Sequence, residues 1–171
     1  ANVPLPRSAL VLGARATASS ALAGLGELGI TASTVAARRF GGPGSVVAAA
    51  SRLGVSIEQV LWSDIEAVDR AAHGVDLIIS TLPASAADPL AERLNVREGQ
   101  ILLDVVYAPR QTALRSTFEK AGGIVAEGTD MLVYQAAAQV QLMTGRSPDT
   151  GVMRDALEEE LERRSRLGLV P

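Results

Sequence analysis

The chain has 171 residues, of which 47% are hydrophobic and 3% aromatic, so it can form one packed domain, or one domain with an appended subdomain. Its net charge of −3 and the lack of a basic block argue against nucleic acid as a partner. No apolar run is long enough to cross a bilayer, and no signal-peptide pattern is present. The absence of Cys excludes disulfides and fits a reducing, cytoplasmic location, and a single His argues against a transition-metal site.

Short apolar runs alternate with Ala-rich stretches of helical character, which predicts an α/β fold. The run at 9–12 is apolar throughout, as is typical of a strand buried on both faces of a parallel sheet. We therefore expect a Rossmann-like, doubly wound, mostly parallel sheet with a C-terminal helical pair. In chain order, the predicted elements are a strand at 9–12, a helix at 17–28, a strand at 33–37, helix 45–52, strand 59–62, helix 64–72, strand 76–81, strand 101–106, helix 112–121, strand 123–126, and helices 130–144 and 149–167.

The turn after the first strand lies where dinucleotide-binding folds carry their glycine fingerprint. There, backbone N–H groups at a helix N-terminus point at the pyrophosphate. The turn reads Gly13-Ala14-Arg15-Ala16-Thr17-Ala18, so only the first of three glycines is present. Arg15 would bring bulk to the place where the backbone approaches phosphate, although its charge offsets part of that loss. The sequence therefore supports either a dinucleotide site or an ordinary turn in a domain with weak or lost nucleotide affinity.

The second predicted strand ends in Ala37-Arg38-Arg39, and no Asp or Glu lies near it. An acidic residue at this place would bind the ribose 2′-hydroxyl of NAD, whereas Arg favours the 2′-phosphate of NADP. Paired arginines are also common on surfaces simply because they are well solvated. Because of their position at the end of the second strand, Arg38 and Arg39 predict NADP as the cofactor.

Two later segments carry a more specific pattern. Asp104-Val105-Val106-Tyr107-Ala108-Pro109 is a buried strand that runs into Tyr-x-Pro-x-x-Thr, and Gly128 opens a helix that carries Met-Leu-x-x-Gln. This pairing resembles the C-terminal half of shikimate dehydrogenases. The similarity extends from Ala9 to about Leu157. The chain departs from the family pattern at Arg15, on both sides of Arg38, and at Asp130, where the family usually has Gly.

The resemblance implies a set of cofactor contacts and two substrate contacts. Thr81 and Leu82 would flank the cofactor, Val105 and Gly128 would border the nicotinamide, and Tyr107 and Gln135 would face the substrate. The implied NADP contacts are Gly13, Ala14, Arg15, Ala16, Thr17, Arg38, Arg39, Thr81, Leu82, Val105, Gly128, Met131 and Leu132. Tyr107 and Gln135 would bind shikimate or 3-dehydroshikimate. Each of these side chains could instead be ordinary core or solvated surface when it is considered singly.

The resemblance further implies a parent enzyme that reduces 3-dehydroshikimate to shikimate with NADPH. In that family, a Lys and an Asp of an N-terminal catalytic domain handle proton transfer, and no counterpart of that domain is found here. Lys120, the only lysine, lies on a predicted surface helix near the wrong end of the sheet. We therefore expect residues 1–127 to form the NADP-binding part, which is inactive alone. Residues 128–171 would form helices that pack on the missing domain.

Three further expectations follow from individual residues. Asp104 is expected to accept hydrogen bonds from loop N–H groups rather than to act as a base, and His73 is expected to stabilise a helix C-terminus. Val133, Leu142, Met143 and Val152 would expose apolar surface and favour self-association to a homodimer. Two alternatives remain open at this point, namely a reductase or sensor domain for another ligand, and a non-catalytic interaction domain that lost nucleotide binding.

Overall fold

The computed structural model describes residues 5–169 and forms one parallel sheet in the order β3-β2-β1-β4-β5-β6. The fold prediction is confirmed, with every strand pair parallel. The strands are β1 (Ala9–Leu12), β2 (Ala32–Ala37), β3 (Ser56–Leu61), β4 (Leu77–Ser80), β5 (Ile101–Asp104) and β6 (Ile124–Glu127). The helices are α1 (Ala16–Glu27), α2 (Val46–Leu53), α3 (Ile65–His73), α4 (Asp88–Ala91), α5 (Ala113–Lys120), α6 (Gly128–Thr144) and α7 (Thr150–Arg166).

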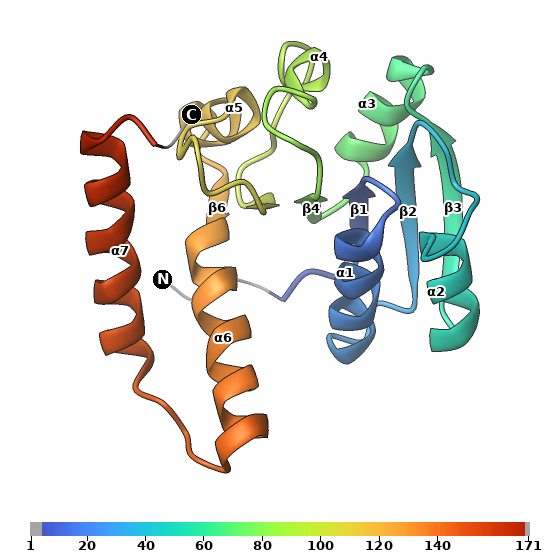
Figure 1. Ribbon diagram of the computed structural model, residues 1–171. Helices are drawn as coiled ribbons and strands as arrows, with labels where there is room; N and C mark the ends of the chain where they lie inside the picture. The colour runs from blue at the N-terminus through green and yellow to red at the C-terminus, as the bar shows by residue number, and fades with distance from the viewer. Residues whose placement is uncertain (1–4, 170–171) are drawn as a thin grey trace.

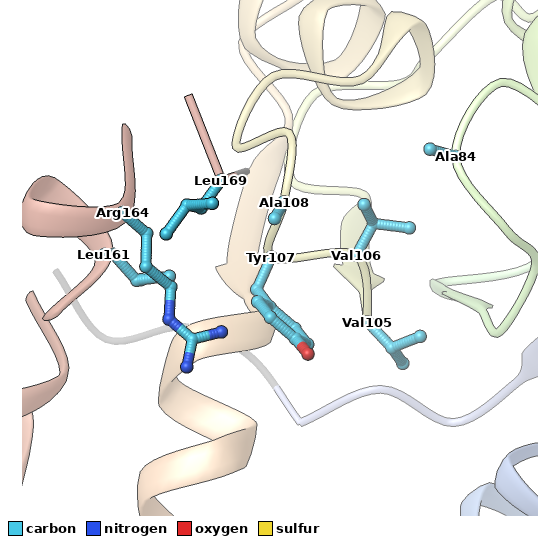
Figure 2. A pocket seen from close by; sticks show the side chains of 8 residues that line it. All are labelled: Ala84, Val105, Val106, Tyr107, Ala108, Leu161, Arg164 and Leu169. Atoms are coloured by element: carbon cyan, nitrogen blue, oxygen red, sulfur yellow. The ribbon is translucent and has the colours of Figure 1, made fainter. Parts of the chain in front are cut away.

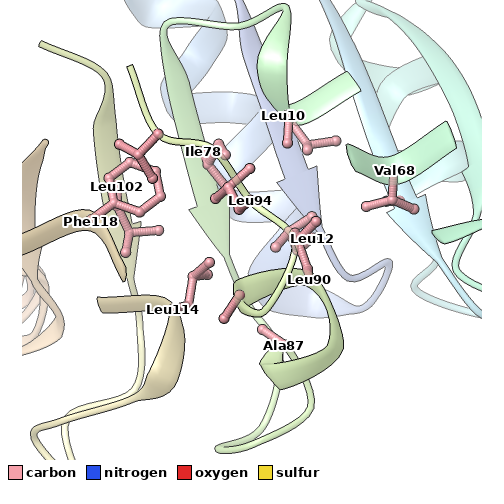
Figure 3. Close-up of a cluster of buried hydrophobic side chains, with 14 of the residues drawn as sticks. Leu10, Leu12, Val68, Ile78, Ala87, Leu90, Leu94, Leu102, Leu114 and Phe118 are labelled. Atoms are coloured by element: carbon pink, nitrogen blue, oxygen red, sulfur yellow. The ribbon is translucent and has the colours of Figure 1, made fainter. Parts of the chain in front are cut away.

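The core has two layers because strand residues alternate between the faces of the sheet. Leu10 and Leu12 of β1 join the layer beneath α3, α4 and α5, which includes Leu102 and Phe118 (Figure 3). Val11, the residue between them, joins the layer beneath α1 and α2. All four residues of β1 are buried, as the continuous apolar run predicts.

The predicted elements differ from the structure in two places. The third strand begins at Ser56 rather than at 59. Ile57 and Val60 of this edge strand are three residues apart and pack on opposite faces of the sheet, so they show no period of two. The four-residue helix α4 was not predicted. It follows a loop and carries Pro89 in its first turn, so it has too few residues to show a helical period.

The chain changes direction across the sheet at β1, which has β2 on one side and β4 on the other. In open α/β sheets, ligands bind outside the carboxyl ends of the strands at such a switch point. Gly13 follows β1 and Thr81 follows β4, so the two residues lie on the two sides of this point. The backbone N–H of Thr81 donates to the carbonyl of Leu12 at 2.9 Å, which joins the two strand ends.

Helices α6 and α7 form an antiparallel pair beside the sheet, on the side away from β3 (Figure 1). Ion pairs link α7 to its neighbours, Arg154 to Asp130 of α6 and Glu158 to Arg110 of the loop before α5. Asp130, a departure from the family pattern, therefore connects the two helices. No residue of α7 is buried, and the buried residues of α6 lie in its first two turns.

The predicted exposure of apolar residues on this pair is correct for three of the four side chains. Leu142 is 87% exposed, Met143 83% and Val152 65%. Val133 is instead 3% exposed, because the N-terminal part of α6 packs against the end of the sheet. Within residues 5–169, no helix combines the length and the hydrophobicity needed to cross a membrane.

Candidate functional site

The turn after β1 can only be made by glycine. Gly13 has φ +112°, a conformation that side chains disfavour, and a Cβ there would overlap the hydroxyl of Thr81. That hydroxyl donates to the carbonyl of Leu12 at 2.7 Å, and the N–H of Gly13 donates to Ala36 at 2.8 Å. The first position of the fingerprint is therefore retained for a steric reason.

Helix α1 begins at Ala16, and its N-terminal N–H groups have no side-chain cap. By contrast, Ser45 caps α2, Asp64 caps α3 and Thr112 caps α5. Free N–H groups at a helix N-terminus, together with the positive end of the helix dipole, suit an anion. Among the predicted turn residues, Ala14 is buried, whereas Arg15, Ala16 and Thr17 are exposed beside this N-terminus.

Arg38 and Arg39 directly follow β2, and both side chains are exposed. Neither forms an ion pair with an acidic side chain of residues 5–169. The loop that they open returns to the glycine turn, where the N–H of Val46 donates to the carbonyl of Ala14 at 3.1 Å. The two arginines therefore belong to the same edge of the sheet as the α1 N-terminus.

Thr81 and Leu82 lie at the switch point, as expected, but their side chains face the protein. The hydroxyl of Thr81 donates a hydrogen bond to the carbonyl of Leu12, and Leu82 packs against the core layer beneath α3, α4 and α5. The structure therefore gives both residues a packing role beside the crevice.

Asp104, at the end of β5, anchors the loop that carries Tyr107. Its carboxylate accepts the N–H of Val106 at 3.2 Å and the hydroxyl of Thr112 at 2.7 Å. Thr112 in turn caps α5 by accepting the N–H of Arg115 at 3.1 Å. The expectation that Asp104 accepts a loop N–H is confirmed, and the Thr of the Tyr-x-Pro-x-x-Thr segment acts as a clip between β5 and α5.

A cavity of about 370 Å³ opens over this loop (Figure 2). Two of its lining residues, Val105 and Tyr107, were predicted to border the nicotinamide and the substrate. Leu161, Arg164 and Leu169, at the end of α7 and beyond it, close the other side. Sequence analysis missed these three residues, because no local pattern indicates that 161–169 folds back over 105–108. The remaining lining residues are Ala84, Val106 and Ala108.

Helix α6 begins directly against the end of β5. A Cβ on Gly128 would lie 2.8 Å from the carbonyl oxygen of Val105, so the backbones are in contact here. Met131 and Leu132 are half-buried one turn further along, and Gln135 is exposed. The structure thus brings Val105, Tyr107 and Gly128 together, whereas Gln135 does not line the cavity.

A charged cluster holds the turn between β6 and α6. Arg115 lies between Glu119 at 2.7 Å and Glu127 at 2.9 Å, and its hydrogen bond lowers the pKa of Glu127. Hydrogen bonds to the same two carboxylates raise the pKa of Arg115, and the bond to Glu119 has the larger effect. Glu127 also accepts the hydroxyl of Thr129 at 3.2 Å. This cluster fixes the segment that leads into Gly128.

Neither Lys120 nor His73 lines the cavity. Lys120 is the last residue of α5, so it lies toward the edge of the sheet where β6 begins rather than toward the cavity. His73 ends α3 and lies 3.7 Å from Asp69. No cluster of three or more His, Cys, Asp or Glu side chains suited to a metal ion occurs within the part of the chain that the structure describes.

Residues 128–158 match a family profile described as the C-terminal domain of shikimate 5′-dehydrogenase. A shikimate dehydrogenase (NADP(+)) of Methylobacterium radiotolerans is 32% identical over 158 residues, which are 90% of this chain and 54% of that protein. The crystal structure of Mycobacterium tuberculosis shikimate dehydrogenase superposes with a TM-score of 0.77 at 36% identity, over 87% of this chain and 56% of that one.

The Thermus thermophilus shikimate 5-dehydrogenase, crystallised with NADP(H) and shikimate, superposes with a TM-score of 0.69 at 28% identity. That match covers 92% of this chain and 56% of the Thermus chain. The chain therefore spans little more than half the length of these proteins, and the part that it matches is their C-terminal part.

Proposed function

The chain belongs to the shikimate dehydrogenase family, and from that premise we propose that it is the NADP-holding part of an enzyme that interconverts 3-dehydroshikimate and shikimate. The observation that carries the proposal is the switch point itself. There, the obligatory Gly13 and the uncapped N-terminus of α1 face the same edge of the sheet as Arg38 and Arg39. The Thermus relative with NADP(H) and shikimate supports the same assignment.

The proposed cofactor would extend along the carboxyl edge of the sheet. Its diphosphate would take the N–H groups of the turn from Gly13 to Thr17, and its 2′-phosphate would take Arg38 and Arg39. The nicotinamide end would reach Val105 and Gly128, where the two backbones already touch. NADPH supplies the hydride when it is bound.

The protein's own contribution at this end is to orient the reactants and to exclude water. Val105, with the half-buried Met131 and Leu132, would provide an apolar wall, and a dry site strengthens the electrostatic interactions inside it. The hydroxyl of Tyr107, at the cavity, would bind the substrate, with Gln135 as a second contact. Gln135 is exposed, so this role needs a further surface to cover it.

Acid–base catalysis is assigned to the part of the relatives that this chain does not match. Lys120 lies away from the cavity, and Asp104 is already bonded to Val106 and Thr112. We therefore propose that the chain by itself shows no turnover. Measurable oxidation of shikimate by the purified chain with NADP would contradict this.

The proposed division of labour follows the change in burial along the chain. Residues 1–127 would form the NADP-binding part, and residues 128–171 would pack on the catalytic part, with 1–4 and 170–171 outside the described residues. The exposed Leu142, Met143 and Val152 support this division, because such side chains favour a covering surface.

Calorimetric titration with NADP and, separately, NAD tests the proposal. Saturable binding with NADP preferred is expected, and Arg38→Ala should weaken NADP binding while leaving NAD binding unchanged. Arg52→Ala is the matched control, because it removes an exposed arginine from the last turn of α2, away from the crevice. No binding of either cofactor would favour the alternative, motivated by Arg15 and the two absent glycines, of an interaction domain without nucleotide affinity.

A further inference from the structure

Arg15 lies in the turn before α1, and its side chain reaches toward the loop between β2 and α2. Its guanidinium Nη1 lies 4.0 Å from the position that a Cβ on Gly42 would take, in the loop between β2 and α2. The side chain therefore extends from the end of β1 across the end of β2. The backbone of Arg15 has φ −103°, which any residue adopts, so this position does not need glycine.

The segments that Arg15 joins are held together by backbone hydrogen bonds. Gly13 donates to Ala36 of β2, and Val46 at the start of α2 donates to Ala14, at 2.8 and 3.1 Å. In the register of the sheet, Leu12 pairs with Ala36, so Arg38 comes just two residues beyond the partner of the last β1 residue. The reach of Arg15 is thus directed toward the loop that Arg38 and Arg39 open.

Charge at this edge of the sheet favours an anionic ligand, although the total charge of the chain is −3. Arg15, Arg38 and Arg39 lie at this edge, whereas the two acidic residues up to the end of β3 lie elsewhere, Glu27 as the last residue of α1 and Glu58 within β3. None of Arg15, Arg38 and Arg39 forms an ion pair with a carboxylate of the described residues 5–169. The positive charge of this edge is therefore not neutralised by the fold.

We infer that Arg15 binds the ribose 2′-phosphate of the cofactor together with Arg38 and Arg39, and so helps to select NADP over NAD. A phosphate monoester is the group that guanidinium recognises best, because its oxygens accept paired N–H bonds. This inference rests on the proposed function, since it assigns one more residue to the same site. Arg15, which replaces a glycine of the fingerprint, would then contribute to cofactor specificity.

Arg15→Gly tests the inference, because Gly is well accepted at a helix N-cap and restores the residue of the fingerprint. The whole chain would be titrated with NADP, NAD and adenosine 2′,5′-bisphosphate. We expect Arg15→Gly to raise the Kd of NADP and that of the bisphosphate by roughly tenfold to a hundredfold, which is the range for the loss of one charged hydrogen bond. NAD binding should be unchanged, Arg15→Lys should recover part of the loss, and Arg52→Ala should have no effect.

The other outcomes overturn the inference in distinguishable ways. If NADP and NAD weaken equally, Arg15 holds the shared diphosphate, and if both strengthen, it obstructs the turn. If the unaltered chain prefers NADP and Arg15→Gly binds NADP and NAD with the same affinities, the inference fails while the proposed function stands. If the unaltered chain binds none of the three compounds, both fail. Circular dichroism and a thermal melt of Arg15→Gly would establish that the variant is folded.

Discussion

Gly128 and Val105 are in backbone contact, with 2.8 Å between the Val105 carbonyl oxygen and the position of a Cβ on Gly128. The start of α6, at Gly128, therefore packs directly against Val105, the residue that follows β5. Tyr107, two residues beyond Val105, borders the cavity, and Met131 lies one turn into the helix. A change in how α6 meets the sheet would therefore move both walls of the proposed nicotinamide end.

Gly128→Ala should reduce the stability of the fold, because the added methyl group meets backbone atoms that cannot rotate away. We expect the free energy of unfolding in urea to fall by about 1–3 kcal/mol, as for overpacked sites. Gly24→Ala is the control, since a Cβ at Gly24 of α1 meets nothing within 4 Å and improves helix propensity. Equal stability of the two variants would show that α6 can shift without cost.

Thr112→Val should release the loop that carries Tyr107. The substitution keeps the shape but removes the hydroxyl that donates to Asp104 and caps α5. A loss of about 1–2 kcal/mol in unfolding free energy is expected for the cap and the hydrogen bond together. Hydrogen exchange at the Val106 amide should accelerate, whereas Thr112→Ser, which keeps the hydroxyl, should stay close to the unaltered chain.

Acid should destabilise the chain in part through Glu127. The hydrogen bond from Arg115 lowers the pKa of Glu127 below its ordinary value of 4.5, so its ionised form is favoured in the folded state. The stabilisation is fully present above pH 4.5 and is lost as the pH falls through the lowered pKa. In Arg115→Gln, the Glu127 pKa measured by carboxyl NMR should rise toward 4.5. An unchanged titration would mean that the pair is broken in solution.

The exposed apolar residues of α6 and α7 should drive self-association. Leu142 and Met143 stand almost fully in solvent, and Val152 lies at the start of α7. Sedimentation velocity should show a species that grows with concentration toward a homodimer, and Leu142→Ser with Met143→Ser should reduce it. Leu28→Ser, which alters an exposed leucine after α1, serves as the control. A monomer at all concentrations would exclude this face as a dimer contact.

Predictions from sequence succeeded where the signal is local. The four apolar residues of β1 indicate a buried strand because both faces of a central parallel strand are covered. Gly13 is expected at the turn because only glycine tolerates its backbone conformation. The edge strand β3 was placed too late, since its exposed polar residues mask the period on which the prediction depends.

The sequence by itself determined the class of the fold, the order of its strands and of every helix but α4, and the resemblance to shikimate dehydrogenases. These are encoded in the periodicity of apolar residues and in short motifs such as Tyr107-x-Pro109-x-x-Thr112, which are local properties. Only the tertiary structure decided that Arg164 meets Tyr107 at one cavity, that Val133 is buried, and that Arg15 reaches toward Gly42. Such contacts join residues far apart in the chain. They depend on how whole helices and strands pack, and local sequence patterns do not indicate this packing.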